Sequence, residues 1–290
     1  MRPDRLTELA RTRLTDPGAI RKAADVRPRA TGPLGPTGKC FIIAADHPAR
    51  GALATGGDPM AMADRGDLLD RLTTALENPG CNGVLATADI LEDLLLLGAL
   101  DGKTVFGSMN RGGLAGAAFE IDDRFTGMSA NAIARMGFDG GKMLTRIDYD
   151  DDRTAPTLEA TARAVDALAE QGLIAMVEPF ISRREGGKVV NDLTTEGVVT
   201  SVAIASGLGS TSAYTWLKLP TAPDMARVAA ASTLPMVVLG GEVADLAAQR
   251  ESWGRSLALP NVVGLTVGRS LLYPADGDVA GAVEAVVSLL

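Results

Sequence analysis

The sequence predicts an α/β protein that folds as a single (βα)8 TIM barrel with a short N-terminal helical extension. Eight short, continuously apolar runs have the composition of buried parallel strands. Amphipathic segments with a period near 3.6 residues lie between most of these runs. A length of 290 residues is also common for one barrel of this kind. A doubly wound parallel sheet fits the same alternation and is the main alternative.

The chain starts with a segment that precedes the alternating pattern. We expect two short amphipathic helices near residues 3–13 and 17–26, followed by a link rich in Pro and Gly over residues 27–39. Nothing beyond this point suggests a second domain. We therefore divide the chain into an N-terminal helical extension and linker, residues 1–38, and a catalytic barrel domain, residues 39–290.

The apolar pattern places each element of the barrel in order. We expect strands at residues 40–45, 83–86, 104–108, 142–147, 174–179, 214–219, 236–239 and 262–267. The expected helices cover residues 67–76, 90–97, 157–171, 194–206, 222–231, 242–253 and 279–290. The third crossover, residues 111–137, is long and irregular, and we expect its helix only at about residues 129–136.

Composition excludes several classes of function. The net charge of −8 argues against a nucleic-acid partner, which requires a basic face. No apolar run reaches the ~18 residues of a membrane span, and the N-terminus lacks a signal-peptide core, so we expect no membrane partner and a cytoplasmic location. Cys40 and Cys81 form no disulfide or zinc pattern, and His47 is the single histidine. We therefore expect no metal and no cofactor.

Polar residues stand at most of the predicted strand ends, which is where a barrel carries its active site. They are Asp46 and His47 after the first strand, Asn110 and Arg111 after the third, Lys142 and Arg146 on the fourth with Tyr149 just beyond, Glu178 on the fifth and Lys218 on the sixth.

Lys142 and Lys218 are unusual because both lie inside apolar runs of a chain with six lysines and 22 arginines. Burial in a low dielectric lowers the pKa of an ammonium group, and we expect this of Lys218, with Lys142 nearby as a like charge. A partly neutral lysine attacks carbonyl carbon, which is the first step of Schiff-base catalysis. Alternatively, each lysine reaches solvent at a strand end or pairs with a carboxylate such as Glu178.

Glycines follow the last two predicted strands. Gly240 and Gly241 come directly after the seventh strand, and Gly268 and Arg269 come after the eighth. Barrels commonly hold a phosphate at this place, on backbone N–H groups, and Arg269 could add a bidentate contact. The alternative is a tight turn beside a surface arginine.

These strand ends resemble those of the class I (Schiff-base) aldolases, in particular the tagatose-bisphosphate and archaeal-type fructose-bisphosphate aldolases. The matching motifs are Ala-Ala-Asp-His-Pro-Ala-Arg-Gly at 44–51, Lys142, Val-Glu-Pro at 177–179, Trp-Leu-Lys-Leu-Pro at 216–220 and the glycine turns at 240 and 268. They cover about residues 40–270, and deoxyribose-phosphate aldolase is a looser match. The chain also resembles actinobacterial barrels associated with inositol breakdown, whose aldol substrate is a phosphorylated dehydro-deoxy-gluconate. Pro48 departs from the Gly that usually follows Asp-His in the aldolase group.

The resemblance implies a metal-independent lyase of carbohydrate metabolism that cleaves a phosphorylated keto sugar, with Lys218 as the Schiff-base lysine and Asp46, Lys142 and Glu178 beside it. The candidate bases for the substrate hydroxyl are Glu178, Asp46 and, third, Tyr149. We expect His47, Asn110, Arg111 and Arg146 to bind the substrate, Gly240, Gly241, Gly268 and Arg269 to bind its phosphate, and the protein to be a homo-oligomer.

Two alternatives come from other classes of function. One is a sugar-phosphate-binding regulatory barrel that turns over slowly. The other is a phosphosugar isomerase or acyl-transferring barrel that uses the same phosphate site.

Overall fold

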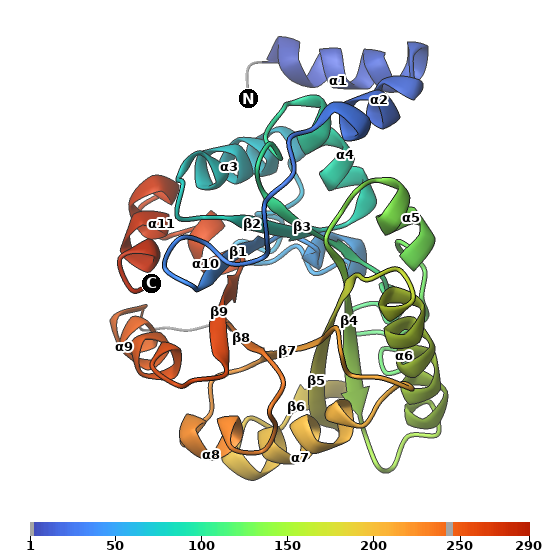
Figure 1. Cartoon of the computed structure of the whole chain (residues 1–290), viewed down its shortest axis with the longest axis vertical. Helices are drawn as coiled ribbons and strands as arrows, with labels where there is room; N and C mark the ends of the chain where they lie inside the picture. Colours follow the sequence, from blue (N-terminus) through green and yellow to red (C-terminus); the bar gives the residue numbers. More distant parts are fainter. Residues whose placement is uncertain (1–2, 242–245) are drawn as a thin grey trace.

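Eight parallel strands close into a barrel in the computed structural model, which describes residues 3–241 and 246–290. Figure 1 looks along the barrel, with the strands forming a ring inside the helices. Within the described residues, the strands pair in the order β1-β2-β3-β4-β5-β7-β8-β9, and β9 pairs with β1. This closed ring confirms the predicted fold and excludes a doubly wound sheet, whose edges stay open.

The strands agree closely with the expected runs. They are β1 (Cys40–Ala44), β2 (Gly83–Ala86), β3 (Thr104–Ser108), β4 (Gly140–Ile147), β5 (Ile174–Glu185), β7 (Thr215–Leu219), β8 (Met236–Leu239) and β9 (Val262–Val267). The helices that follow them are α3 (Arg65–Glu77), α4 (Ala88–Leu96), α5 (Ala130–Arg135), α6 (Thr154–Ala169), α7 (Thr195–Ser206), α8 (Met225–Ala229), α9 (Leu246–Leu257) and α11 (Val279–Val287).

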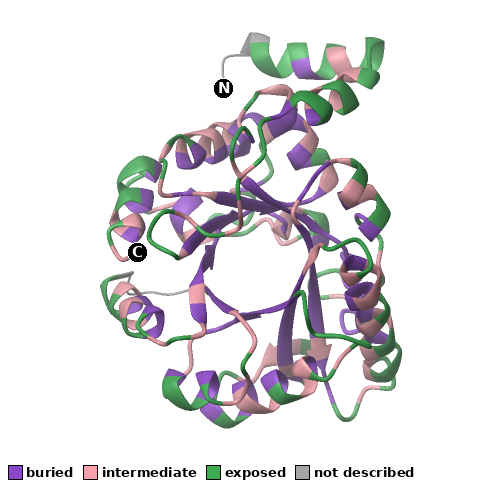
Figure 2. Ribbon diagram, in the orientation of Figure 1, coloured by how far each residue is buried: buried purple, intermediate pink, exposed green. Residues whose placement is uncertain are grey.

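The burial pattern divides the core into two parts. The larger part lies between the strands and the surrounding helices, and the smaller part fills the barrel interior. Figure 2 shows the strands of the barrel ring mostly buried, apart from the end of β5, while the helices are buried on the side that faces the barrel and exposed on the other. This is the pattern that continuous apolar strands and amphipathic helices produce.

Inside the barrel, an apolar layer is followed by a polar one. Phe106, Met176 and Trp216 belong to the interior cluster, and the rings of Phe106 and Trp216 lie 6.4 Å apart. Because side chains two residues apart share a strand face, the interior positions next along these strands are Ser108, Glu178 and Lys218. All three are buried. The alternation of the strands therefore sets the polar residues above an apolar floor, toward the C-terminal ends of the strands.

Strand β5 is longer than expected. It was predicted to end at Pro179, but it continues to Glu185 and pairs with the antiparallel β6 (Lys188–Asn191), which the sequence analysis missed. Gly186 and Gly187 connect the two strands at φ of 57° and 82°. Two glycines with positive φ are typical of a tight hairpin turn, so this turn was recognisable in the sequence.

Short helical segments account for the other differences. The 3-10 helix η1 (His47–Arg50) and the single-turn helix α10 (Arg269–Leu272) follow β1 and β9 and were not predicted. Helix α8 is shorter than expected because Asp224 caps it by accepting a hydrogen bond from the backbone N–H of Arg227. The expected helix at 242–253 begins in residues that lie outside the described part of the chain.

The N-terminal helices α1 (Pro3–Thr15) and α2 (Gly18–Val26) lie on the outside of the barrel against α4 (Figure 1). Arg13 joins them to α4 through ion pairs with Glu92 and Asp93 at 3.0 and 2.8 Å. The linker then crosses the N-terminal ends of the strands, where buried Arg27 donates to the carbonyls of Lys103 and Gly137. The linker thus covers part of the barrel bottom and leaves the opposite end to the polar layer.

None of the helices in the described residues has the length and apolar character to cross a membrane.

Candidate active site

Four elements bring the two predicted lysines and the two predicted carboxylates together. Asp46 follows β1, Lys142 lies on β4, Glu178 on β5 and Lys218 on β7. The four side chains are between 2% and 7% exposed, so the barrel removes all of them from water. Buried charges persist only when they are paired. The pairings among these four residues therefore define the site.

Glu178 lies between the two lysines. Its Oε1 accepts a hydrogen bond from the Lys218 ammonium, and its Oε2 forms an ion pair with Lys142. The register places Val177 opposite Leu217, which sets the next residues, Glu178 and Lys218, side by side on neighbouring strands. Burial alone raises the pKa of this carboxyl, but the charges of Lys142 and Lys218 outweigh it and lower the pKa of Glu178 to about 2. Glu178 is therefore a carboxylate at neutral pH.

Asp46 is the second carboxylate of the site that pairs with buried cations. Its Oδ2 lies 3.2 Å from Lys142 Nζ and 2.7 Å from Arg111 Nη2, and it accepts a hydrogen bond of 3.1 Å from Ser108. Burial raises the pKa of Asp46, but Arg111 and Lys142 overcome this and hold it well below the usual value. The sequence analysis did not single out Ser108, although its position at the end of β3 marked it as a strand-end residue.

Lys142 has a perturbed pKa. Burial and the nearby Arg111 lower it, Asp46 and Glu178 raise it, and the result is a pKa of about 8. A small fraction of Lys142 is therefore neutral near pH 7. Glu178 is the direct hydrogen-bond partner of Lys218, so this side chain does not have the wholly apolar surroundings that were expected for it.

His47 lies at the edge of this cluster. Its Nδ1 is 3.9 Å from Asp46 Oδ1, which is too long for a hydrogen bond, and its side chain is 27% exposed. Burial lowers the pKa of His47 despite the attraction of Asp46, and the positive charges of Arg269 and Lys218 lower it further. The imidazole is therefore neutral at pH 7. The charges that act on it come both from the lysine cluster and from Arg269 in the turn after β9.

The side chain of Asn110 forms hydrogen bonds to the backbone of Leu144. Its Nδ2 donates to the carbonyl of Leu144 at 2.5 Å, and its Oδ1 accepts from the N–H of Leu144 at 2.8 Å. Both ends of the carboxamide are engaged with the backbone, and the residue is fully buried. Asn110 links the segment after β3 to the strand β4. These hydrogen bonds position the next residue, Arg111, beside Asp46.

Tyr149 is not brought to the cluster. Its side chain lies just beyond β4 and is 73% exposed. A group that acts as base in an aldol step must reach the substrate hydroxyl within hydrogen-bond distance. The structure thus places Tyr149 outside the buried cluster.

The loop after β3 adds charged residues that the sequence analysis missed. Arg50 pairs with Asp123 in the interior and donates to the carbonyl of Gly113 at 2.5 Å, and Arg146 Nη2 lies 2.9 Å from Glu120 Oε1. Asp123 and Glu120 belong to an irregular segment without a periodic pattern, so no sequence signal connected them to the barrel.

The glycine turns after β8 and β9 lie next to each other. A Cβ on Gly240 would lie 2.6 Å from a methyl carbon of Val267 and 3.5 Å from Ser270 Oγ. A Cβ on Gly268 would lie 2.4 Å from the carbonyl oxygen of Ala44 and 3.1 Å from His47 Cε1. The close approach requires glycine at both positions, and Gly241 has a positive φ of 66°. Arg269 lies beside them and donates to the carbonyl of Ala54 at 3.3 Å.

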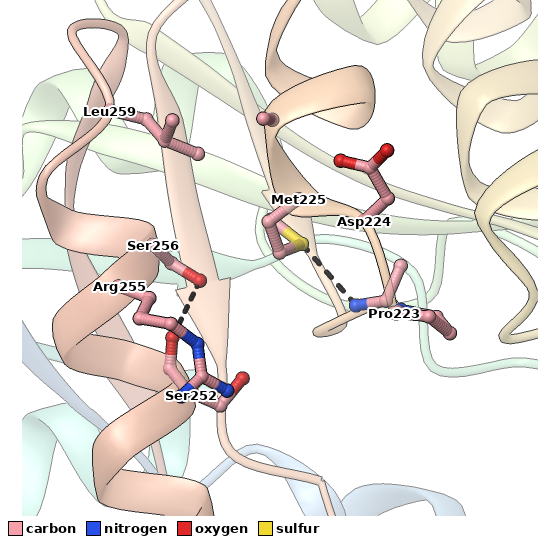
Figure 3. Close-up of a pocket in the computed structure, with 9 residues that line it drawn as sticks. Pro223, Asp224, Met225, Ser252, Arg255, Ser256 and Leu259 are labelled. Carbon is pink, nitrogen blue, oxygen red and sulfur yellow. Dashed lines mark hydrogen bonds between the residues drawn. The ribbon is translucent and has the colours of Figure 1, made fainter.

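Two further observations concern possible sites elsewhere in the described residues. Across residues 3–241 and 246–290, no three His, Cys, Asp or Glu side chains gather in a group that could hold a metal ion. A cleft of about 210 Å³ lies between α8 and α9, and no lysine is among the residues that line it (Figure 3). Two of its polar side chains bond within α9: Ser256 donates to the carbonyl of Ser252, and Arg255 donates to Glu251. We assign no function to this cleft.

Comparison with known proteins identifies relatives of this chain. The sequence model of the Cgl0159-like family matches residues 38–287. The crystal structure of Cgl0159 from Corynebacterium glutamicum has 52% sequence identity to the chain and a TM-score of 0.97, and the match covers 100% of this chain and 97% of that one. No curated protein matches the chain.

Two aldolases share the fold at low identity. An archaeal fructose 1,6-bisphosphate aldolase has 19% identity and a TM-score of 0.62 over 89% of this chain and 95% of that one. The fructose-bisphosphate aldolase from Slackia heliotrinireducens DSM 20476 has 14% identity and a TM-score of 0.60 over 87% of this chain and 86% of that one. At these identities the likeness concerns the barrel fold alone.

Proposed function

The chain belongs to the Cgl0159-like family, and from that premise we propose that it is a class I aldolase that cleaves a phosphorylated keto sugar through a Schiff base on Lys218. The observation that carries the proposal is the hydrogen bond between Lys218 and Glu178 inside the barrel, with Lys142 on the other oxygen of Glu178. A buried amine, a carboxylate in contact with it and a second cation are the groups that an imine-forming lyase needs.

The first step joins the Lys218 amine to the substrate ketone. The Lys218 ammonium first passes one proton to Glu178, and the neutral amine attacks the carbonyl carbon. That proton then returns to the carbonyl oxygen, which leaves as water, and the product is a protonated iminium. The iminium carries the same positive charge as the ammonium that it replaces, so Glu178 still has a cation beside it. No buried charge is left without a partner at this stage, which keeps the step compatible with the buried site.

The second step breaks the carbon–carbon bond. A base removes the proton from the hydroxyl at C4, the C3–C4 electron pair moves into the iminium, and an aldehyde and an enamine result. Glu178 is the better-placed base because it is the carboxylate in contact with Lys218. The enamine then takes up a proton at C3, and water hydrolyses the new iminium and releases the ketone product. Lys142 orients the substrate hydroxyls as a cation, and Asp46 keeps Lys142 in place.

The turns after β8 and β9 are the proposed phosphate site. Gly240 and Gly268 let the two turns pack closely against Val267 and Ala44, a Cβ on Gly241 would meet no atom within 4 Å, and Arg269 supplies a positive charge beside them. His47 lies against both parts of the site, because its Cε1 would be 3.1 Å from a Cβ on Gly268 and its Nδ1 is 3.9 Å from Asp46 Oδ1, so the turn after β9 is close to the buried cluster. The substrate class that fits is a phosphorylated keto sugar, which includes ketose phosphates and the phosphorylated dehydro-deoxy-gluconate.

Borohydride trapping tests the proposal. We expect borohydride, with a panel of phosphorylated keto sugars, to leave a reduced adduct on the peptide that contains Lys218. Lys218→Met should abolish both the adduct and aldol cleavage, whereas Lys188→Met, at an exposed position of the β5–β6 hairpin, should change neither. An adduct on Lys142 alone would move the chemistry to β4. Turnover that survives Lys218→Met would exclude the Schiff base on Lys218.

A metal-independent mechanism also predicts that EDTA leaves the activity unchanged. Activity that EDTA removes and zinc restores would contradict it. An adduct without measurable cleavage would favour a slow regulatory barrel, and binding without an adduct would favour an isomerase or acyl-transferring barrel.

A further inference from the structure

We propose that Lys142 is the acid that protonates the enamine carbon after the carbon–carbon bond breaks, and that Arg111 is the positioning residue that makes its ammonium group ready to release a proton. This inference rests on the proposed function and adds two residue roles to it. One step of the proposed cycle has no donor, because the enamine must take up a proton at C3. The group that supplies this proton must lie close to both Lys218, which carries the enamine, and Glu178, which holds the hydroxyl proton.

Lys142 lies where this donor is needed. Its Nζ contacts Oε2 of Glu178, while Oε1 of the same carboxylate accepts a hydrogen bond from Lys218. The two amines are therefore separated by a single carboxylate. The enamine carbon C3 is bonded to the carbon that carries the Lys218 nitrogen. A substrate joined to Lys218 thus brings C3 to the carboxylate that also contacts Lys142, and no further path into the barrel is required.

The other groups around the amines are poor proton donors. The pKa of Asp46 is held well below its usual value by Arg111 and Lys142, so this carboxylate has no proton to give. The guanidinium of Arg111 stays charged near neutral pH, because the ordinary pKa of arginine is above about 12. His47 is neutral at pH 7, and a neutral imidazole releases its remaining proton far less readily than an ammonium does.

The buried cluster carries more positive than negative groups. Within the described residues, the contacts join the cations Lys142, Lys218 and Arg111 to the carboxylates Asp46 and Glu178. A buried charge without a partner is costly, so a cluster with an excess cation releases a proton more easily than a matched one. The arginine keeps its proton, and a lysine must therefore supply it. A group that only orients hydroxyls would not need this excess charge.

Arg111 acts on Lys142 through Asp46. Its Nη2 lies 2.7 Å from Asp46 Oδ2, and Lys142 Nζ lies 3.2 Å from the same oxygen. Asp46 is thus already neutralised by a permanent cation at the oxygen that Lys142 contacts. The charged groups that face Lys142 are Arg111 and Lys218, which lower its pKa together with burial, and Asp46 and Glu178, which raise it. The resulting pKa of about 8 suits a group that gives and takes a proton near neutral pH.

The proton of the C4 hydroxyl then reaches C3 by way of two side chains. Glu178 removes the hydroxyl proton as the C3–C4 bond breaks. The Lys142 ammonium gives a proton to C3, the enamine electron pair forms the new C–H bond, and the nitrogen of Lys218 returns to the iminium state. Glu178 passes its proton to the neutral Lys142 amine, which its Oε2 contacts, and both groups are restored.

Deuterium exchange tests this step in the reverse direction. The probe is dihydroxyacetone phosphate, the ketone that C3–C4 cleavage of a ketose 1-phosphate releases. In D2O, a neutral Lys142 removes a proton from the iminium of this ketone and returns deuterium, which proton NMR detects as the loss of a C–H signal. We expect Lys142→Arg to reduce the exchange rate by at least about a hundredfold, because a guanidinium does not release its proton. Lys188→Arg, at an exposed position of the β5–β6 hairpin, is the matched control and should leave the rate unchanged.

The pH dependence of the exchange at saturating ketone tests Arg111. The wild-type rate should rise to a plateau with its midpoint at about pH 8, because Lys142 must be neutral to act as a base. Loss of the Arg111 charge stabilises the ammonium, so Arg111→Met should move the midpoint upward by about one pH unit or more, and Arg111→Lys should keep it in place. Arg183→Met, an exposed arginine paired with Glu185, is the control and should not move it. A midpoint that stays at its wild-type value in Arg111→Met would overturn the role of Arg111.

Borohydride trapping separates this inference from the proposed function. Each protein is treated with borohydride and the same ketone, and an adduct on Lys218 shows that the protein is folded and forms the iminium. An adduct in Lys142→Arg together with wild-type exchange would overturn the role of Lys142, make Glu178 the donor and leave the Schiff base intact. If Lys142→Arg gives no adduct, the midpoint in Arg111→Met decides, because that variant retains Lys142. The absence of an adduct in the wild type would contradict the Schiff base itself.

Discussion

The ammonium group of Lys218 donates a hydrogen bond to Oε1 of Glu178 between two neighbouring barrel strands, and both side chains are less than a tenth exposed. The second oxygen of Glu178 contacts Lys142. One carboxylate therefore holds two buried cations, and its removal leaves both without their common partner.

Replacing Glu178 by glutamine should affect catalysis more than any other change to a carboxylate of the site. The amide cannot accept the hydroxyl proton, so we expect aldol cleavage to fall by about two to four orders of magnitude. Loss of one partner from a buried ion pair should also lower the free energy of unfolding by about 3–5 kcal/mol. Steady-state kinetics and urea denaturation measure the two effects. If Asp46→Asn abolishes cleavage while Glu178→Gln retains it, Asp46 is the base.

The stability of the protein should depend on Glu178 in acid. The pKa of Glu178 is lowered from 4.5 to about 2 in the folded protein, chiefly because Lys142 and Lys218 overcome the opposing effect of burial. The unfolded chain then binds this proton more readily, so the stabilisation is complete above pH 4.5 and is lost as the pH falls toward 2. Urea denaturation from pH 6 to pH 3 should show a smaller loss of stability for Glu178→Gln than for wild type. Identical slopes would contradict the lowered pKa.

Cleavage should decline as Lys142 loses its proton. Its pKa is lowered to about 8 by burial and by Arg111, and its proposed role requires the cation. We expect the rate at saturating substrate to fall above about pH 8, and Lys142→Arg, which stays charged, to remove this decline. A rate that instead rises through pH 8 and is lost in Lys142→Arg would identify Lys142 as the nucleophile.

Asn110 should contribute to stability. Its carboxamide satisfies the N–H and carbonyl of Leu144, both buried, so Asn110→Ala leaves two backbone groups unpaired. Each unpaired buried group costs about 1–3 kcal/mol, and we expect the free energy of unfolding to fall by at least about 2 kcal/mol. Asn131→Ala, at an exposed position of α5, is the matched control and should change little. Equal effects of the two substitutions would refute the bridging role.

Gly268→Ala should weaken the proposed phosphate site. The added methyl group would lie 2.4 Å from the carbonyl oxygen of Ala44, so the turn after β9 must move away from β1. We expect a higher KM for a phosphorylated keto sugar, by about tenfold or more, if the turn contributes a contact worth 1.4 kcal/mol. Gly254→Ala in α9 is the control, because its Cβ meets no atom within 4 Å. An unchanged KM in Gly268→Ala would argue against phosphate at this turn.

Much of the fold follows from local patterns. The runs at Gly83–Ala86, Met236–Leu239 and Val262–Val267 were predicted with the bounds that the structure has. Strands buried on both faces are apolar throughout, and this signal does not depend on distant contacts. The extension of β5 was missed because Pro179 was taken as its end, although β5 continues through Pro179 in register with Thr145 of β4.

The candidate site was only partly predictable. Position at a strand end identified Asp46, Lys142, Glu178 and Lys218, since the end of a parallel strand in a barrel faces the mouth. The same rule also selected Asn110 and Tyr149. It does not distinguish a side chain that enters the buried cluster from one that bonds to the backbone, as Asn110 does, or is exposed to solvent, as Tyr149 is. It gave no sign of Glu120 or Asp123, which lie in the irregular segment after β3.

The sequence by itself determined that eight apolar runs alternate with amphipathic helices and that charged residues follow the runs, because these are properties of neighbouring residues. Only the tertiary structure decided which charges meet. Glu178 touches Lys218 and Lys142 because strand register and barrel closure bring β4, β5 and β7 together. The spacing of residues 142, 178 and 218 along the chain carries no information on that contact, and the contact with the two lysines keeps Glu178 a carboxylate although it is buried.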